Sequence, residues 1–316
     1  MNAEASWRVV MNFAKVGFST SITIEMDDLS RLILRAEALL ARVEALLPPA
    51  LAAPDWKASV AYRWRKRGGR GHLEPVARPH RIRLQDLRNI DEQKKRIERN
   101  TRQFVEGRSA NNVLLTGARG SGKSSIVRAL LNAYADKGLR IIEVDKQDLI
   151  DLPDIVDLLH DRPERFILFC DDLSFEAGET AYKALKSVLD GSLAAPPDNV
   201  LIYATSNRRH LMPEYFSENL ETTRVEDEIH PGETTEEKIS LSERFGLWVT
   251  FYPCSQEHYL AIVAHWLGHF GVDADEIAAL EREALNWSLG RGSRSGRVAW
   301  QFAKDYAGRA RKKKRS

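Results

Sequence analysis

A short segment in the first half of the chain combines glycine, lysine and serine in a pattern suited to binding phosphate. Residues 117–124 read Gly-Ala-Arg-Gly-Ser-Gly-Lys-Ser, which matches the P-loop pattern G-x-x-x-x-G-K-[ST]. Glycines let backbone amides wrap a β-phosphate, the lysine neutralises the β- and γ-oxygens, and the serine hydroxyl binds Mg²⁺. We therefore expect ATP to be bound by Gly117, Ala118, Arg119, Gly120, Ser121, Gly122, Lys123, Ser124 and Ser125.

Two adjacent carboxylates follow an apolar stretch one α/β unit later. Residues 166–172 read Phe-Ile-Leu-Phe-Cys-Asp-Asp, a buried strand pattern that ends in two acids. Ligands bind at the carboxyl edge of open parallel sheets. We expect Asp171 to hold Mg²⁺ through water, together with Ser124, and Asp172 to orient or deprotonate the attacking water. A pair of acids after a strand is common in itself. The position of this pair, one α/β unit after the P-loop, is what favours a catalytic role for it.

Three further polar residues are candidates for catalysis. Asn207 ends the apolar run 200–207 and is suited to hold the lytic water or the γ-phosphate, the alternative being a turn or cap residue. Arg244 precedes the last apolar run of this region, and Arg297 lies at the start of the final helical pattern. One arginine alone is usually a solvated surface residue, but two that follow these motifs are better explained as donors of charge to a transition state. The expected catalytic residues are Lys123, Asp172, Asn207, Arg244 and Arg297.

Alternating strands and helices must bring these groups together. The predicted strands are continuously apolar, which is typical of parallel strands covered on both faces; they are residues 112–115, 139–144, 165–170, 200–204 and 247–252. The predicted helices between and before them are residues 84–107, 122–135, 155–160 and 180–189. After Pro253 the pattern is helical throughout, at 256–270, 275–288 and 296–307. We predict an α/β fold, a doubly wound parallel-sheet P-loop domain followed by a small all-helical lid.

Composition divides the chain into five segments. They are an N-terminal amphipathic helix and linker (1–55), a basic extension (56–83), the nucleotide-binding domain (84–253), the helical lid (254–308) and a basic tail (309–316). The extension is expected to form a strand or loop, and the tail to be mobile. Between residues 208 and 242 an acid-rich insertion has few apolar residues, which predicts a surface loop or short helices.

The order of these motifs resembles that of the AAA+ ATPases. It comprises Walker A (the P-loop), Walker B (Asp171 and Asp172), sensor 1 (Asn207), an arginine-finger box at 242–246 and sensor 2 (Gly296 and Arg297). The stretches FCDDLSFE, YATSNRRHL, SLSERFGLWVTFYP and RGSRSGRVA look more closely like an uncharacterised bacterial AAA+ branch, domain of unknown function 815. Helicase-loader-type ATPases are more distantly similar.

The resemblance assigns roles to particular residues. It implies that Arg244 is an arginine finger in an ATP-dependent homo-oligomer, that Arg297 is sensor 2, and that the segment before 87–91 contacts adenine. Two positions depart from the expected pattern: Asp172 stands where many AAA+ proteins have Glu, and Asn89 stands where we expect a glycine. Asn is among the few residues that tolerate positive φ. Nothing in residues 1–49 resembles the family.

Charge and composition limit the partners and the compartment. The chain has 47 basic and 45 acidic residues and a net charge of +2, so affinity for nucleic acid must come from local clusters. Two clusters qualify, Arg63–Arg83 and Arg309–Arg315, although the first is also explained as a strand whose basic edge packs on the α/β body. No apolar stretch approaches the roughly 18 to 20 residues that span a bilayer. Cys170 and Cys254 match no disulfide framework, so we expect a cytoplasmic protein.

The sequence thus predicts an ATP-hydrolysing, Mg²⁺-dependent enzyme without naming its client. We favour a remodeller of a protein or complex over a nucleic-acid-associated ATPase related to helicase loaders. A P-loop kinase is the least favoured, because no acceptor-binding lid motif is visible. His265 and His269 have the spacing of metal ligands, but the accompanying glutamate and a third ligand are absent, so zinc is not expected.

Overall fold

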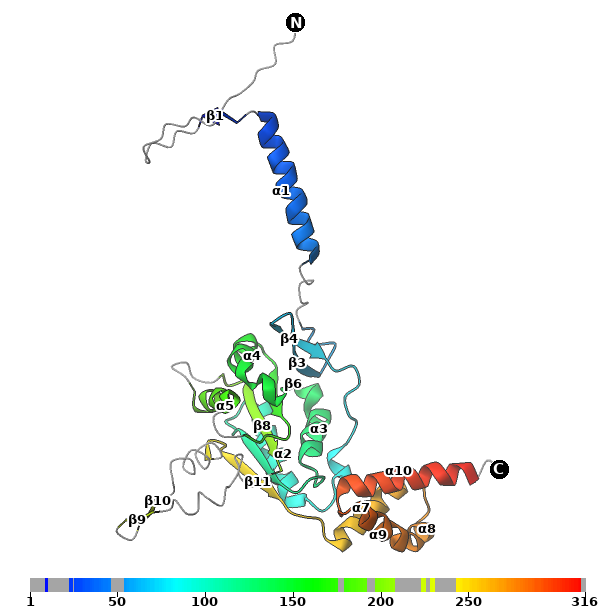
Figure 1. Cartoon of the computed structure of the whole chain (residues 1–316). Helices are drawn as coiled ribbons and strands as arrows, with labels where there is room; N and C mark the ends of the chain where they lie inside the picture. Colours follow the sequence, from blue (N-terminus) through cyan, green and yellow to red (C-terminus); the bar gives the residue numbers. More distant parts are fainter. Residues whose placement is uncertain are drawn as a thin grey trace. The chain divides into compact units, whose positions relative to one another are not determined.

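The computed structural model describes residues 9–10, 23–24, 26–46, 54–175, 179–191, 197–207, 223–225, 228–230 and 243–313. The chain divides after residue 53 into two compact units. The first contains the helix α1 (Met26–Leu46) and the strands β1 (Val9–Val10) and β2 (Thr23–Ile24), which pair in antiparallel fashion (Figure 1). Among the described residues, no helix combines the length and the apolar character that crossing a membrane requires.

The second unit is built on a seven-stranded sheet. In spatial order its strands are β11 (Leu247–Phe251), β5 (Val113–Gly117), β8 (Val200–Ser206), β7 (Arg165–Cys170), β6 (Leu139–Glu143), β3 (Ala61–Arg67) and β4 (Arg70–Pro75). Every neighbouring pair is parallel except β3 and β4, which form an antiparallel hairpin at one edge. The carboxyl ends of β5, β8 and β7 therefore lie side by side.

Helices cover both faces of this sheet (Figure 1). On one face α2 (Asp91–Val105) and α3 (Lys123–Tyr134) bury Ile97, Phe104 and Ile126 against the strands. On the other face α4 (Leu152–Leu159) and α5 (Thr180–Asp190) bury Ile155 and Leu185. Fully burying such a side chain contributes about 1.5–3 kcal/mol. Because both faces are covered, the central strands are apolar throughout, as the sequence predicts. Short 3₁₀ helices complete the connections: η1 (Leu84–Asp86), η2 (Ala135–Lys137) and η3 (Lys146–Asp151).

A helical lid with its own core follows β11. Its helices are α7 (Gln256–His269), α8 (Ala274–Ala279), α9 (Glu281–Gly290) and α10 (Gly296–Lys313). Tyr259, Leu267 and Phe302 are fully buried in that core. The sequence predicts one helix over 275–288, whereas the structure has two. The amide of Leu280 donates to the Ile277 carbonyl oxygen (3.1 Å), a tight closing bond at which α8 ends and α9 begins.

The basic extension and the basic tail both belong to elements that cross the predicted segment boundaries. The hairpin of β3 and β4 belongs to the main sheet, because β3 pairs with β6, so the α/β unit begins well before residue 84. This confirms the interpretation of the extension as a strand packed on the α/β body. Helix α10 continues to Lys313 rather than ending near 307. Gly308 does not stop it, because the Arg309 guanidinium binds Asp305 (2.9 Å) one turn back and Glu283 (2.8 Å) on α9.

The acid-rich insertion lies largely outside the described residues. Its described parts are β9 (Thr223–Val225) and β10 (Glu228–His230), which pair in antiparallel fashion. The expectation of a loop or short helices is therefore wrong for these residues. A threonine, a valine and an isoleucine among them favour extended backbone.

Candidate functional site

The P-loop connects β5 to α3 at the carboxyl edge of the sheet, and two of its glycines are required by its shape. Gly117 has φ +125°, and a Cβ there would lie 1.9 Å from the Phe251 carbonyl oxygen on β11. Gly122 has φ +106° and is the residue from which α3 starts. Other residues rarely adopt these backbone angles. The loop can therefore pass close beneath β11 and present the N-terminus of α3 to a ligand.

Lys123 is almost fully buried within this loop. Its ammonium donates to the carbonyl oxygens of Gly117 (2.7 Å) and Ala118 (2.8 Å) and to Oδ1 of Asn207 (3.0 Å). Burial lowers the pKa of Lys123, while the nearby charges of Asp172 and Asp171 raise it. Among the described residues, every hydrogen-bond partner of this ammonium is neutral. Its positive charge is therefore still available to a phosphate, which can take the place of these acceptors.

Asp171 is bound to the P-loop helix by hydrogen bonds. Its Oδ1 accepts from the hydroxyls of Ser124 (2.6 Å) and Thr205 (2.6 Å), and Arg128 on α3 lies 3.8 Å from its Oδ2. A hydroxyl and a carboxylate oxygen at contact distance are hard oxygen donors of the kind that Mg²⁺ prefers. The pair predicted as metal ligands, Ser124 and Asp171, therefore fits that ion.

Asp172 has a positive φ of +54°, a backbone conformation that is uncommon in residues other than glycine and that Asp tolerates better than most. Its amide donates to Oγ1 of Thr205 (2.9 Å), and its carboxylate accepts from the Asn207 side chain. Arg119 of the P-loop lies 3.9 Å from its second carboxylate oxygen. Positive φ in a non-glycine residue costs about 1–3 kcal/mol and persists only where the surroundings hold it. Here these contacts hold the carboxylate toward the P-loop.

Thr205 was not singled out by sequence reasoning, although it holds both acids. One hydroxyl donates to Asp171 and accepts the amide of Asp172. The signal available in the sequence is the polar end of the run 200–207, but its meaning depends on β8 lying next to β7. Arg128 was missed for the same reason, since only the folded chain shows that it approaches Asp171. Arg119 was predicted as a phosphate-binding residue of the P-loop, but its approach to Asp172 was not.

The lid contacts the P-loop directly. The Gly296 amide, at the start of α10, donates to the Gly120 carbonyl oxygen (3.0 Å). Gly120 has φ +73°, and a Cβ on it would lie 2.7 Å from Oγ of Ser295 and 3.4 Å from Cβ of Arg297. The charge of Arg297 contributes, after burial, to lowering the pKa of Lys123. The structure therefore places Arg297 beside the phosphate-binding loop.

Arg244 stands apart from this cluster. Its guanidinium forms an ion pair with Asp190, at the C-terminal end of α5. Residues 231–242 lie outside the described part of the chain, which resumes at Glu243, one residue before Arg244. Its role as an arginine finger stays a prediction.

The segment expected near adenine lies between η1 and α2. Asn89 has φ +61°, the backbone region in which the sequence analysis expected a glycine, and its side-chain amide donates to the His258 carbonyl oxygen on α7 (3.1 Å). Cδ1 of Ile90 lies 3.3 Å from where a Cβ of Gly122 would be. Apolar atoms of this segment thus lie against the P-loop. Contact with adenine stays a prediction.

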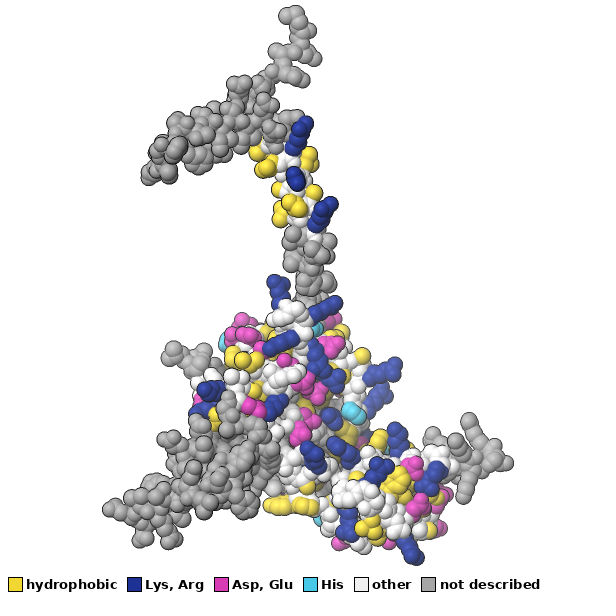
Figure 2. All heavy atoms as spheres, viewed as in Figure 1, with side chains coloured by type: hydrophobic (Ala, Val, Ile, Leu, Met, Phe, Trp, Pro, Cys, Tyr) yellow, Lys and Arg dark blue, Asp and Glu magenta, His cyan; other side chains and the backbone are white. Residues whose placement is uncertain are grey.

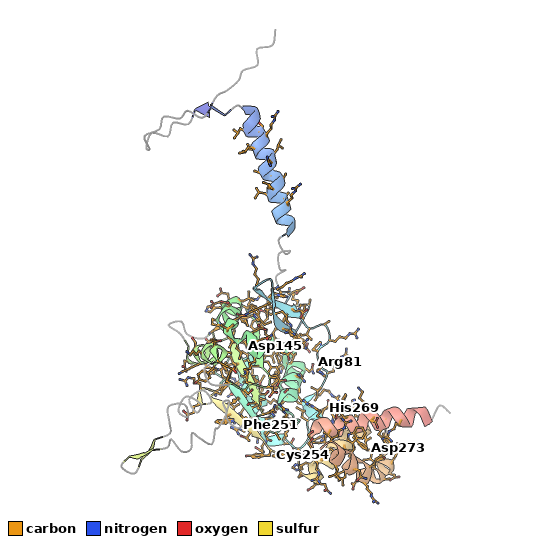
Figure 3. The ribbon with its side chains drawn as sticks, in the orientation of Figure 1. Arg81, Asp145, Phe251, Cys254, His269 and Asp273 are labelled. Atoms are coloured by element: carbon orange, nitrogen blue, oxygen red, sulfur yellow. The ribbon has the colours of Figure 1, made fainter. Side chains whose placement is uncertain are left out.

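The first strand of the basic hairpin carries ion pairs. Three of its cations meet carboxylates on or after β6 (Asp145 is labelled in Figure 3): Arg63 with Glu143 (2.8 Å), Arg65 with Asp145 (2.5 Å) and Lys66 with Asp151 (2.9 Å). Their charge is therefore largely neutralised within the protein.

Comparison with known families gives one match, which covers most of the chain. A family model described as "Protein of unknown function (DUF815)" matches residues 57–310. The chain belongs to the DUF815 family. The match begins just before the basic hairpin and ends within α10, so it takes in the sheet, the site and the lid. The predicted DUF815 family and the predicted fold class, a largely parallel α/β sheet domain followed by a small all-helical lid, are confirmed.

The DUF815 chain is also similar to several solved structures. A RuvB variant from Thermotoga maritima is 18% identical, with a TM-score of 0.46, over 71% of this chain and 63% of that chain. A HORMA:CdnC:Trip13 complex from E. coli MS115-1 contains a chain that is 13% identical, with a TM-score of 0.43, over 70% and 90% of the two chains. A DNA replication initiation factor is 15% identical, with a TM-score of 0.42, over 71% and 63%. The match thus spans less than two thirds of the RuvB chain. A comparison with proteins of curated function finds no match.

Proposed function

We propose that this DUF815 protein is a Mg²⁺-dependent ATPase that converts ATP and water to ADP and phosphate. One observation carries the proposal: Lys123, Ser124, Asp171, Asp172 and Asn207 are joined by hydrogen bonds at one edge of the sheet. They come from three separate segments of the chain, and each has the chemistry that one part of phosphoryl transfer requires.

The phosphates of ATP bind where the lysine now makes its contacts. On binding, Lys123 exchanges the carbonyl oxygens of Gly117 and Ala118 for β- and γ-oxygens. Ser124 and Asp171 hold Mg²⁺, which when bound neutralises charge on those oxygens. The amide groups at the start of α3 face the same phosphates.

Hydrolysis then needs a positioned water molecule. Asn207 and Asp172 are bonded to each other, so one water can reach both side chains. The oxygen of the water bonds to the γ-phosphorus, and Asp172 accepts a proton from that water. At the same time the bond between the γ-phosphorus and the oxygen that bridges it to the β-phosphorus breaks, and ADP leaves with that oxygen. Arg297 supplies positive charge in cis, and Arg244 supplies it to the ATP of a neighbouring subunit in a homo-oligomer.

We infer that the hydrolysis drives remodelling of a protein or complex. An ATPase associated with nucleic acid is the second candidate, and a groove on the lid, described below, favours it. The cytoplasm is the proposed compartment. Cys170 and Cys254 are free thiols, and burial raises the pKa of the Cys170 thiol to about 12, so Cys170 stays protonated and unreactive.

The test separates binding from turnover. We expect Lys123→Ala to lose ATP affinity, because the lysine meets the phosphates in the ground state, and Asp172→Asn to keep ATP and stop hydrolysis. Titration with a fluorescent ATP analogue and assays of phosphate release measure the two properties. Lys137→Ala, just after α3, and Asp198→Asn, at the opposite end of β8, are matched controls. Undiminished turnover in Asp172→Asn would remove that residue from the mechanism.

A further inference from the structure

The lid carries a groove formed by α9 and α10. It has a volume of about 630 Å³, and its lining includes Trp287, Arg291, Trp300, Lys304, Gly308 and Arg309. Figure 2 shows basic and hydrophobic side chains close together on the lid, at the lower right. None of these residues is a candidate for ATP hydrolysis. The groove therefore needs an explanation of its own.

Two tryptophans of the groove each lie under a cation. The Arg291 guanidinium is 5.0 Å from the ring centre of Trp287, and the Lys304 ammonium is 4.9 Å from that of Trp300. Trp300 is 38% exposed, a large value for an aromatic ring of this size. The buried indole N–H of Trp287 has no hydrogen-bond partner within the described part of the chain. The groove thus offers an open aromatic surface at Trp300.

The charges of the groove favour an anionic ligand. Arg309 is already paired with Asp305 and Glu283, but Arg291 and Lys304 have only aromatic partners among the described residues. Beyond Arg309, helix α10 runs into the basic end of the chain, Arg-Lys-Lys-Lys-Arg at 311–315. Arg291 and Lys304 therefore leave positive charge in the groove for an anion.

Aromatic rings combined with unpaired cations fit one class of polyanion best. Base stacking on aromatic rings and phosphate contacts with Lys and Arg are how proteins bind single-stranded nucleic acid. An acidic peptide would use the cations and leave the exposed ring of Trp300 without a partner. We propose that this groove binds single-stranded nucleic acid, with a base on Trp300 and the neighbouring phosphates on Lys304 and Arg291.

Gly308 provides a variant that blocks the groove without removing any contact. A Cβ at this position meets nothing within 4 Å, so a side chain there extends into open space. Replacing a glycine inside a helix also stabilises the helix, by roughly 0.5–1 kcal/mol for alanine. Gly308→Gln should therefore fill the groove while the lid stays folded, and Gly308→Ala is the matched small substitution.

The experiment measures binding by the full chain without nucleotide. Anisotropy titrations use fluorescein-labelled oligothymidylate and oligouridylate at several salt concentrations, which also distinguishes DNA from RNA. We expect Trp300→Ala to weaken binding about 10-fold, Trp300→Phe to retain most of it, and Gly308→Gln to weaken it while Gly308→Ala does not. Lys304→Ala should lower the log-log salt slope by about 0.7. Leu289→Ala, exposed on α9 outside the groove, is the control for lid stability.

Three results would overturn the proposal. The first is wild-type affinity in both Trp300→Ala and Gly308→Gln, with melting temperatures showing that both are folded. The second is equal competition by polyglutamate at matched charge, which would leave only a general attraction for anions. The third is loss of binding on truncation after Ala310, which removes the basic run 311–315, together with no effect of Trp300→Ala. That pair of results would assign the affinity to the basic end alone.

Discussion

The nucleotide site and the basic hairpin both gather charge at the sheet, but they hold it differently. In the hairpin, Arg63 and Lys66 each face a carboxylate of opposite charge. In the site, the ammonium of Lys123 and the carboxylate of Asp171 are held mainly by neutral carbonyl, amide and hydroxyl groups. The two regions therefore differ less in how many charges they contain than in whether the partners of those charges are charged or neutral.

This difference has a chemical consequence. An exposed ion pair contributes about 0–1 kcal/mol and has little net charge left for a ligand. A charged group with neutral partners keeps its field and can exchange those partners for phosphate or metal. We therefore expect substitutions in the site to affect turnover strongly and substitutions in the hairpin to affect almost nothing.

The largest effect is expected for Arg244→Ala, a residue outside both regions whose ion pair with Asp190 must be exchanged for ATP before it can act. If Arg244 reaches the ATP of a neighbouring subunit, its loss should lower turnover by about 10³- to 10⁵-fold without changing ATP affinity. Specific activity of the wild-type protein should also rise with its concentration. Phosphate release and ATP titration measure both.

A mixture of two inactive proteins decides whether Arg244 acts in trans. Arg244→Ala and Asp172→Asn together can form interfaces that pair an intact Arg244 with an intact Asp172, so activity should return. Asp190→Asn is the control, because it removes the ion pair of Arg244 and keeps the arginine. A mixture that stays inactive although the variants assemble together would make Arg244 a cis or structural residue.

Gly117→Ala should affect folding as well as activity. The added Cβ meets the Phe251 carbonyl oxygen and is placed on a backbone with φ +125°, so we expect a loss of about 3 kcal/mol in the free energy of unfolding. Gly138→Ala is the matched control, since Gly138 also has positive φ, +91°, with nothing within 4 Å of its Cβ. Urea denaturation compares them. Equal losses in the two variants would show that the contact with β11 is unimportant.

Thr205→Val tests the neutral partners of the two acids. Without the hydroxyl, Asp171 loses a donor and the Asp172 amide loses its acceptor, so turnover should fall roughly 10- to 100-fold, equivalent to about 1–3 kcal/mol. Thr205→Ser keeps the hydroxyl and should keep most of the activity. Steady-state phosphate release at saturating ATP gives the answer, and activity lost equally in Ser and Val would point to packing instead.

The smallest effect is expected in the hairpin. A double-mutant cycle of Arg63→Ala and Glu143→Ala should give a coupling free energy below about 1 kcal/mol, because both side chains are partly exposed to water. Chemical denaturation of the four proteins measures it, and turnover should not change. A loss of ATPase activity in either variant would contradict the division between the two regions.

The candidate site was largely predictable where its signal is local. The P-loop glycines, Lys123 and Ser124 lie within one short segment, and the two acids follow a continuous apolar run. Thr205 and Arg128 depend on which strands and helices become neighbours, which a single sequence does not specify. The sheet strands were predictable from apolar runs, whereas the pairing of β3 with β6 joins residues distant in the chain.

In the lid, too, the sequence predicted the helices but not where they end. A helical pattern covers 275–288, but the tight bond at Leu280 that divides it depends on how α8 and α9 pack. The basic run in residues 309–316 suggested a mobile end. Contacts of Arg309 with Glu283 on another helix carry α10 past that point.

Helix α10 connects the P-loop to the groove on the lid, two places that share no side-chain role in the proposed reaction. It has 18 residues, so it is about 27 Å long, and its first amide is bonded to the P-loop. A rotation of about 10° around that bonded end displaces the other end by about 5 Å, since displacement grows with the length of a rigid rod. Lys304 lies at the middle of the rod, and Arg309 lies in its far half. A small change in the P-loop therefore becomes a movement of several ångströms at the surface of the lid.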